Sequence, residues 1–263
     1  MKMLVLGAGK MTEAILMGLK SKMDLGDVHI FSPSGVSASK LAEKVGAKYL
    51  ASVDKFTNPD YVLMGCKPQQ LVELKKIIGN QFNHSLFISM LAALPEADQC
   101  SVLGAKKLVR IMPNLPVGLG EGVTLISSQS APESLQRVQA IFNLLGEAPI
   151  MSEAELEDLT ILTGSGPALF YEFARSLASC FSSLNEKQRE ILVRKVFSGA
   201  AQATSVTPQL SLSEHISAVT SKGGVTIAVL EEWRKEGMSE LLKKGVDAGK
   251  IRSQELKKLI PQS

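Results

Sequence analysis

Short apolar runs alternate with helical patterns through the first part of the chain. A compact apolar run occurs at residues 3–6, and short, mostly apolar runs occur at 28–31, 61–65, 86–89 and 108–111. The segments between them carry apolar residues three and four positions apart, which indicates helices with one buried face. Strands that alternate with helices in this way predict an α/β domain with a mostly parallel sheet. Further strands are predicted at 47–50, 121–127 and 148–150, and helices at 37–45, 69–79, 95–102 and 132–145.

Beyond residue 151 the strand pattern ends and helical periodicity takes over. Apolar residues recur every four positions from Leu169 to Phe181, as on one face of a helix. We therefore predict two domains, residues 1–151 with the sheet and residues 152–263 built of helices. A helical domain of this length without a sheet often pairs with a second copy, so a homodimer is expected.

The turn after the first strand is Gly7-Ala8-Gly9-Lys10-Met11, and a helical pattern follows it. Glycines at this point let a pyrophosphate approach the free N–H groups at the start of the helix. Strand, glycine turn and helix in this order are typical of a dinucleotide-binding unit, although Thr12 replaces the third glycine of the usual fingerprint. The alternative is a tight turn in another kind of parallel α/β protein.

The loop after the second strand favours NADPH over NADH. Folds that bind NAD place an acidic residue near this point, where it holds the ribose 2′-hydroxyl. Here the loop contains Ser32 and Ser34, and the first acidic residue is Glu43. Hydroxyls and turn N–H groups suit a 2′-phosphate, whereas the alternative is a plain serine-rich turn.

Polar residues also follow two later strands. Cys66-Lys67-Pro68 comes after the run at 61–65, and Asn114 follows the run at 108–111 between two prolines. The carboxyl ends of parallel strands face the ligand crevice. We expect Lys67 to face a cofactor phosphate or solvent. We expect Asn114 to contact the nicotinamide or the substrate, unless it serves only the turn.

Residues 219–226 combine three hydroxyls, a lysine and paired glycines directly before a helical pattern that runs from Ile227 to Trp233. Paired glycines let backbone approach a ligand closely, and free N–H groups at a helix start bind anions. A small carboxylate fits such a site. The alternative is a Ser/Thr-rich loop that only caps the helix.

Composition narrows the class of protein. The chain has 263 residues, 45% of them hydrophobic and 21% charged, as in ordinary globular proteins. Basic and acidic residues are mixed, with a net charge of +3, so no nucleic-acid surface is expected. Three separated cysteines indicate a reducing compartment without disulfides. No apolar run reaches the roughly 18 residues of a membrane span, and we expect a cytoplasmic protein.

The polar residues exclude several kinds of chemistry. The three histidines, at positions 29, 84 and 215, lie in unrelated contexts, so neither a Ser-His-Asp set nor a metal site is expected. Hydride transfer needs chiefly orientation and charge matching, because the cofactor carries the difficult step. A carbonyl substrate requires a Lys or His proton donor, whereas a cationic imine requires only a hydroxyl or water near its nitrogen. The hydroxyl-rich segment at 219–226 suits the imine.

Five motifs in order resemble those of 1-pyrroline-5-carboxylate reductases, and the similarity runs over nearly the whole chain. The motifs are Gly7-Ala8-Gly9-Lys10-Met11, Lys67-Pro68-Gln69, Arg110-Ile111-Met112-Pro113-Asn114, Gly164-Ser165-Gly166-Pro167-Ala168, and Val219 to Gly224 with Thr226. The resemblance implies reduction of the pyrroline C=N bond by NADPH or NADH to give L-proline, the last step of proline biosynthesis. It also implies a Rossmann-type domain, a helical dimerisation domain and often a ring of dimers.

The same resemblance implies roles for individual residues. Thr226 is expected to hydrogen-bond the ring nitrogen, with Ser221 in the same pocket. The backbone of Gly223, Gly224 and Val225 is expected to bind the substrate carboxylate, and Glu153 to line the pocket. The expected cofactor residues, from the motifs and from the resemblance together, are Gly7, Ala8, Gly9, Lys10, Met11, Ser32, Ser34, Ser52, Cys66, Lys67, Pro68, Ala92 and Asn114.

The chain departs from the family pattern at a few positions. Val225 stands where Thr or Ala is commoner, which matters little if its backbone N–H does the binding. Ala93 replaces a frequent glycine, Ser52 replaces an asparagine that often helps to bind the cofactor, and Ala218 replaces a polar residue. These departures concern the affinity for the cofactor more than the fold.

Two other functions fit the same plan. A β-hydroxyacid dehydrogenase needs a lysine base in the helical domain, for which Lys222 and Lys195 are the candidates. A regulatory protein that binds a nicotinamide nucleotide without turnover does not need Thr226 or the Gly223-Gly224 pair.

Overall fold

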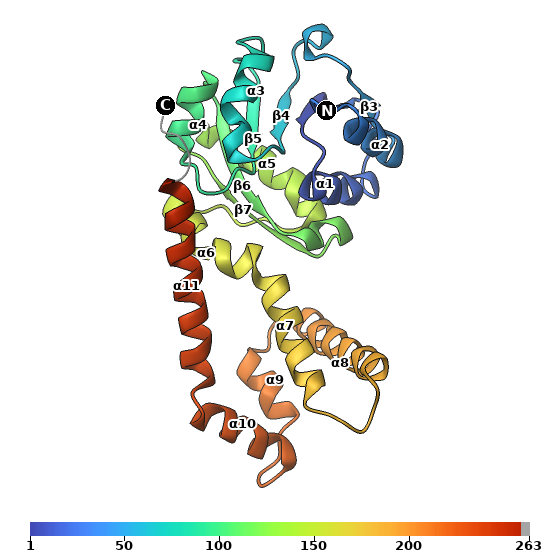
Figure 1. Cartoon of the computed structure of the whole chain (residues 1–263), viewed down its shortest axis with the longest axis vertical. Helices are drawn as coiled ribbons and strands as arrows, with labels where there is room; N and C mark the ends of the chain where they lie inside the picture. Colours follow the sequence, from blue (N-terminus) through green and yellow to red (C-terminus); the bar gives the residue numbers. More distant parts are fainter. Residues whose placement is uncertain (259–263) are drawn as a thin grey trace. The chain divides into compact units, whose positions relative to one another are not determined.

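The computed structural model describes residues 1–258, and its chain forms two compact units (Figure 1). The sheet unit comprises Met1–Ser165 and the chain from Lys250 onward, and the helical unit comprises Gly166–Gly249. The expected domain boundary after residue 151 lies just before helix α6 (Glu153–Gly164), which packs on the sheet and belongs to the sheet unit.

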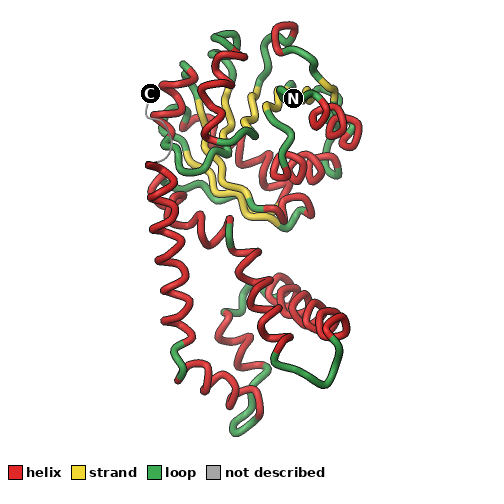
Figure 2. Tube along the Cα trace, viewed as in Figure 1, coloured by secondary structure: helices red, strands yellow, loops and turns green. Residues whose placement is uncertain are grey.

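The sheet, whose strands are yellow in Figure 2, is mostly parallel by its strand pairings, as predicted. Its strand order is β3-β2-β1-β4-β5-β6-β7-β8. Within residues 1–258 every pairing is parallel except that of β6 with β7. The strands are β1 (Met3–Leu6), β2 (Val28–Phe31), β3 (Lys48–Tyr49), β4 (Tyr61–Met64), β5 (Leu86–Ser89), β6 (Leu108–Pro113), β7 (Gly122–Ser127) and β8 (Gly146–Glu147).

Helices connect the strands and then form the rest of the chain. In the sheet unit these are α1 (Lys10–Lys20), α2 (Val36–Val45), α3 (Leu71–Ile78), α4 (Glu96–Leu103), α5 (Leu135–Phe142) and α6. The later helices are α7 (Gly166–Ser179), α8 (Glu186–Val206), α9 (Leu212–Ala218), α10 (Val225–Lys235) and α11 (Met238–Lys258). The 3-10 turns are η1 (Val53–Lys55), η2 (Pro68–Gln70), η3 (Leu115–Leu119), η4 (Pro132–Ser134) and η5 (Asn143–Leu145). In the described residues, no helix is both long and apolar enough to span a membrane.

Alternate residues of β1 explain why both faces of the sheet are covered. Met3 and Val5 belong to one buried apolar cluster, and Leu4 and Leu6 belong to another. Side chains of a strand point alternately to the two faces, so a strand that is apolar at every position requires helices on both sides. The continuous apolar run at 3–6 therefore marks β1 as an interior strand.

Two predicted elements differ from the structure in detail. The helix expected over 132–145 is α5 flanked by the 3-10 turns η4 and η5. The strand expected over 148–150 lies at Gly146–Glu147, and Ile150 makes only an isolated bridge with Ile126. Pro149 explains the second difference, because proline has no N–H to donate to a neighbouring strand.

Candidate active site

The carboxyl ends of β1 and β4 meet where the order of the strands reverses. β1 pairs with β2 on one side and with β4 on the other, and ligands bind outside such a pair of strand ends. Gly7 follows β1 with a φ of 111°. A β-carbon on Gly7 would lie 2.7 Å from the carbonyl oxygen of Gly65, which follows β4. Only glycine fits where these two strand ends meet.

A cavity of about 480 Å³ opens at these strand ends, and we call it the β1–β4 crevice. Helix α1 begins beside it with Gly9 as its N-cap, and no described side chain caps the first turn. The backbone N–H groups of that turn can therefore bind an anion such as a pyrophosphate. The crevice brings together seven of the predicted cofactor residues: Gly7, Ala8, Gly9, Ser32, Ser34, Cys66 and Lys67.

Three serines form a cluster of hydroxyls at one end of the crevice. The Ser37 hydroxyl lies 3.0 Å from the hydroxyl of Ser32 and 3.0 Å from that of Ser34, and Ser32 and Ser34 are 3.4 Å apart. Ser37 lies in the first turn of α2, whose N-cap Gly35 has no described side-chain cap. Hydroxyls and free N–H groups without a carboxylate in the loop suit a phosphate.

Cys66 and Lys67 form the wall of the crevice that follows β4. Burial raises the pKa of the Cys66 thiol to about 11, so at neutral pH Cys66 is an uncharged and unreactive part of the wall. Lys67 is exposed, and its backbone N–H donates to the side chain of Gln70 over 2.9 Å. Because Lys67 is exposed and lines the crevice, its ammonium can meet an anionic ligand there.

The crevice also includes residues that the sequence did not single out as cofactor contacts. Besides Ser37 these include Gln70, Glu73 and Ile77 of the segment after β4. Ser37 lies in α2, and Glu73 and Ile77 lie in α3. The signal that could have found them is the position of α2 and α3 directly after the strands that flank the crevice.

The remaining predicted cofactor residues do not line the described crevice. Ser52 accepts a hydrogen bond from the Asp54 backbone N–H over 3.2 Å and donates to the Asp54 carboxylate over 2.7 Å, so it caps the turn η1. Ala92 is exposed in the loop that follows β5. The others outside the crevice are Lys10, Met11, Pro68 and Asn114.

Asn114 uses its side chain to hold other parts of the backbone. Its carbonyl oxygen accepts from the Val123 N–H over 2.9 Å, and its amide donates to the Thr163 carbonyl over 3.1 Å. The side chain is 7% exposed. Asn114 thus joins the end of β6 to β7 and to the last turn of α6.

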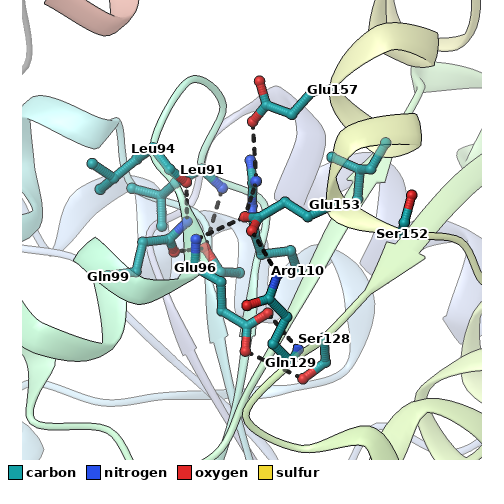
Figure 3. Close-up of polar contacts among 12 residues, drawn as sticks. Leu91, Leu94, Glu96, Gln99, Arg110, Ser128, Gln129, Ser152, Glu153 and Glu157 are labelled. Carbon is teal, nitrogen blue, oxygen red and sulfur yellow. Dashed lines mark hydrogen bonds and ion pairs between the residues drawn. The ribbon is translucent and has the colours of Figure 1, made fainter.

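Glu153 lies in a partly buried polar network of the sheet unit (Figure 3). Its carboxylate accepts from the guanidinium of Arg110 over 2.6 Å and from the backbone N–H of Glu96 over 2.8 Å. The Glu96 carboxylate in turn accepts from the backbone N–H groups of Gln129 and Ser130, at 2.8 and 2.7 Å. Glu153 therefore binds β6 and the start of α4 in this chain.

The second candidate segment lies in the helical unit at the start of α10. Gly223 has a φ of 69°, and Gly224 is the N-cap of α10 with no described side-chain cap. The first N–H groups of α10 are thus available to an anion. A β-carbon on Gly224 would lie 2.4 Å from the hydroxyl oxygen of Ser221. Thr226 is the second residue of α10, and its side chain is exposed.

Both candidate regions are rich in hydroxyl and N–H donors, and both lack a metal site. Among the described residues, no group of three His, Cys, Asp or Glu side chains could hold a metal ion. Burial lowers the pKa of His29, and His29 stacks on Phe56 with ring centres 4.4 Å apart. His29, a residue of β2, is thus uncharged at neutral pH and serves packing.

Two family models match the chain. Residues 153–256 match the pyrroline-5-carboxylate reductase dimerisation family. Residues 2–93 match the family described as NADP oxidoreductase, coenzyme F420-dependent. The first match covers the helical unit together with α6, and the second covers the β1–β4 crevice.

Curated relatives and solved structures match over nearly the full length. The pyrroline-5-carboxylate reductase of Staphylococcus haemolyticus is 30% identical over 98% of both chains, and that of Pasteurella multocida is 29% identical over 97% of both. The structure of the Coxiella burnetii reductase has a TM-score of 0.86 at 25% identity, covering 97% of this chain and 98% of that one. The Plasmodium falciparum reductase, solved with NADP bound, has the same fold, with a TM-score of 0.82 at 21% identity and the same coverage. This chain belongs to the pyrroline-5-carboxylate reductase family.

Proposed function

We propose that this protein reduces the C=N bond of 1-pyrroline-5-carboxylate to give L-proline, the final step of proline biosynthesis, with NADPH or NADH as the reductant. The observation that carries the proposal is the similarity to these reductases over 97% or more of the chain. The two donor-rich regions support it, because one suits a dinucleotide and the other suits a small carboxylate.

The start of α10 is the proposed substrate site. The backbone of Gly223, Gly224 and Val225 binds the carboxylate through the N–H groups of Gly223 and Val225, since the helix start carries a partial positive charge. The Gly224 N–H donates to the Ser221 carbonyl over 2.9 Å. The Thr226 hydroxyl bonds to the ring nitrogen, and Ser221 lies in the same pocket. Glu153 is proposed to line this pocket as well, although in this chain its carboxylate already binds Arg110.

The Thr226 hydroxyl is proposed to suffice because the imine nitrogen is the only atom of the substrate that changes its charge. The bound nicotinamide supplies the hydride, which adds to the imine carbon. The π electrons of the C=N bond then move onto nitrogen, and the protonated imine becomes a neutral amine. A hydroxyl can hydrogen-bond both forms of the nitrogen, so Thr226 can orient the ring before and after the step.

The β1–β4 crevice is the proposed cofactor site. The start of α1 and the backbone of Gly7, Ala8 and Gly9 bind the pyrophosphate. Ser32 and Ser34, with Ser37, bind the 2′-phosphate, which favours NADPH over NADH. Lys67 contributes a positive charge. The other proposed cofactor contacts are Lys10, Met11, Ser52, Cys66, Pro68, Ala92 and Asn114.

The helical unit is proposed to form a homodimer, and dimers to form a ring, in the cytoplasm. Among the described residues of this unit, Gly166 alone is classed as buried. Large apolar side chains of α7 are more than half exposed, for example Leu169, Phe170 and Tyr171. Exposed apolar surface of this kind is typical of an interface, and the match of residues 153–256 to a dimerisation family supports the proposal.

The test is turnover by the purified protein. NADPH or NADH is mixed with racemic 1-pyrroline-5-carboxylate, and oxidation is followed by the absorbance of the reduced nicotinamide. Oxidation that depends on the imine is expected with both cofactors, and faster at low NADPH than at low NADH. A protein that binds NADPH but does not oxidise it with this substrate would contradict the proposal and favour a regulator. Activity restricted to β-hydroxyacids would favour the dehydrogenase.

A further inference from the structure

One face of the segment after β4 forms a wall of the β1–β4 crevice. The residues of this segment that line the crevice, beyond Lys67, are Gln70, Glu73, Leu74 and Ile77. Their spacing of three and four positions places them on one helical face. Leu74 is 6% exposed and belongs to a buried apolar cluster, against which Ile77 also packs. We call these four residues the α3 wall.

Gln70 is held by both backbone polar groups of Lys67. Its side-chain Oε1 accepts from the Lys67 N–H over 2.9 Å, and its own N–H donates to the Lys67 carbonyl over 2.9 Å. Because Oε1 accepts a hydrogen bond, the other end of the amide is the donor Nε2. Nε2 has no acceptor within the part of the chain that the structure describes. The α3 wall thus carries a hydrogen-bond donor whose amide is already oriented.

Glu73 adds an acceptor one helical turn further on. Its Oε2 pairs with the Lys76 ammonium over 3.1 Å. Its other oxygen, Oε1, has no partner among the described residues. The wall therefore presents one donor and one acceptor beside the apolar Leu74 and Ile77. Apolar surface with a few oriented polar groups is typical of a site that binds and orients a small molecule.

The α3 wall suits the base of the dinucleotide better than it suits a phosphate. In the proposed function the start of α1 binds the pyrophosphate, and the cluster of Ser32, Ser34 and Ser37 binds the 2′-phosphate. That phosphate and the base are attached to neighbouring carbons of one ribose, so the base lies close to the serines. Apolar side chains can cover the faces of a base, whereas the Glu73 carboxylate repels a phosphate.

We propose that Gln70 and Glu73 select the 6-aminopurine base of the cofactor: the Gln70 amide donates to ring nitrogen N1, and the Glu73 carboxylate accepts from the 6-amino group. This inference rests on the proposed function. In a 6-oxopurine such as hypoxanthine, N1 carries a proton and position 6 carries an oxygen. Donor then meets donor and acceptor meets acceptor, and each lost hydrogen bond weakens binding by about twofold to tenfold.

The test compares NADPH with its reduced hypoxanthine analogue. The Kd of each is measured by fluorescence titration without substrate, and the readout is the ratio of the two, because a change in stability or net charge affects both nucleotides alike. Glu73→Gln supplies an amide that can donate to the 6-oxo group. Gln70→Glu keeps an oxygen for the Lys67 N–H, as glutamate does in a capping box, and turns the free donor into an acceptor.

Two variants outside the crevice are the matched controls. Gln188→Glu makes the same change in the capping box of α8, where Gln188 accepts from the Asn185 N–H over 3.2 Å. Glu133→Gln makes the same change in an exposed pair with Lys107. Neither of these described residues lines the crevice. Both controls are expected to keep the ratio of the wild type.

The wild type is expected to bind NADPH about tenfold or more tightly than the analogue, and each wall variant to reduce this preference about threefold or more. A wild type that binds both nucleotides equally, or a preference that neither wall variant changes, would overturn the proposal. A protein that prefers NADPH, loses the preference in the wall variants and does not oxidise NADPH with the imine would support the proposal and contradict the proposed function. Absence of binding to either nucleotide would overturn both.

Discussion

Thr12 and Gly65 occupy adjoining space beneath the β1–β4 crevice: a β-carbon on Gly65 would lie 2.1 Å from the hydroxyl oxygen of Thr12. Thr12 stands where the dinucleotide fingerprint usually has its third glycine. Its side chain is 1% exposed, and its hydroxyl finds no hydrogen-bond partner in residues 1–258. The larger residue at position 12 is thus accommodated by the absence of a side chain at position 65.

Gly65→Ala is expected to destabilise the protein by about 1–3 kcal/mol, as overpacking of a buried site does. The Thr12 hydroxyl is the one atom that the new methyl group would meet closer than 3.4 Å within the described residues. Thr12→Ala in the same chain should therefore restore most of the loss. Urea unfolding of both single variants and the double variant measures this. If the changes in the free energy of unfolding of the two single variants add up to that of the double variant, the two residues do not share space.

Ser32→Asp is expected to weaken NADPH binding about tenfold or more and NADH binding much less, because a carboxylate repels the 2′-phosphate. Ser39→Asp is the matched control, since Ser39 lies on α2 outside the crevice and the change in net charge is the same. The dissociation constants are measured by fluorescence titration. Equal weakening of both nucleotides by Ser32→Asp would contradict the placement of the 2′-phosphate at the serine cluster.

Ala93→Gly is expected to leave the stability unchanged or raise it by up to about 1 kcal/mol. Ala93 has a φ of 61°, and a residue with a β-carbon loses about 1–2 kcal/mol in this left-handed region. Glycine removes that strain, which raises the free energy of unfolding. Part of this increase is offset because glycine gives the unfolded chain more conformational entropy. Ala92→Gly, at the neighbouring position without a positive φ, should destabilise. Thermal unfolding measures the stability of both variants. A clear loss of stability in Ala93→Gly would contradict backbone strain at position 93.

The contribution of Glu157 to stability is expected to disappear in acid. Burial works to raise the pKa of Glu157, but the hydrogen bond from Lys257 and the charge and hydrogen bond of Arg110 outweigh it and lower the pKa below 4.5. A lowered pKa stabilises the folded state above pH 4.5, and that contribution is lost as the pH falls through the folded-state pKa. The stability difference between wild type and Glu157→Gln should therefore shrink between about pH 6 and pH 3.

Urea unfolding at several pH values measures this difference. Glu190→Gln is the control, because Glu190 pairs with Arg194 at an exposed site of α8. Exposed pairs of this kind contribute roughly 0.3–0.5 kcal/mol. If the difference in free energy of unfolding between the wild type and Glu157→Gln stays constant down to pH 3, the lowered pKa of Glu157 is contradicted.

Thr226→Ala is expected to lower kcat for the imine about tenfold to a hundredfold, with little change in the Kd of NADPH, because loss of a single oriented hydrogen bond to a reacting group costs on this order. Thr220→Ala is the matched control. Thr220 lies in the same segment, and its hydroxyl donates to the carbonyl of Ile216 over 3.0 Å. Steady-state kinetics of both variants show whether the rate depends on the hydroxyl of Thr226 or equally on that of Thr220. Equal rates for Thr226→Ala and the wild type would remove Thr226 from the mechanism.

The parts of the fold that depend on local sequence were predictable. The apolar run at 3–6 and the mostly apolar runs at 28–31 and 86–89 coincide with strands, because a strand buried on both faces must be largely apolar. Gly7 also predicted the position of the crevice from local sequence. A glycine directly after a strand permits a turn with a positive φ, and Gly7 makes such a turn beside another strand end. Local patterns placed the first strands and the glycine turn without any knowledge of the tertiary structure.

The contacts of polar side chains depend on tertiary structure and could not be predicted. Asn114 looked like a ligand contact because it follows a strand, whereas its amide binds Val123 and Thr163, 9 and 49 residues away in sequence. Glu153 and Glu157 have the spacing of a solvated helix face. They are partly buried because α6 lies on Arg110, and the sequence does not show which strand a helix covers.

Product formation is the most direct test of the proposed function. NADPH oxidised and L-proline formed are measured in one reaction with limiting 1-pyrroline-5-carboxylate, with Thr226→Ala as the comparison. One L-proline for each NADPH oxidised is the result that the proposed function predicts, with formation slowed about tenfold or more by Thr226→Ala. NADPH that is stable in the presence of the imine, or oxidised without formation of L-proline, would contradict it.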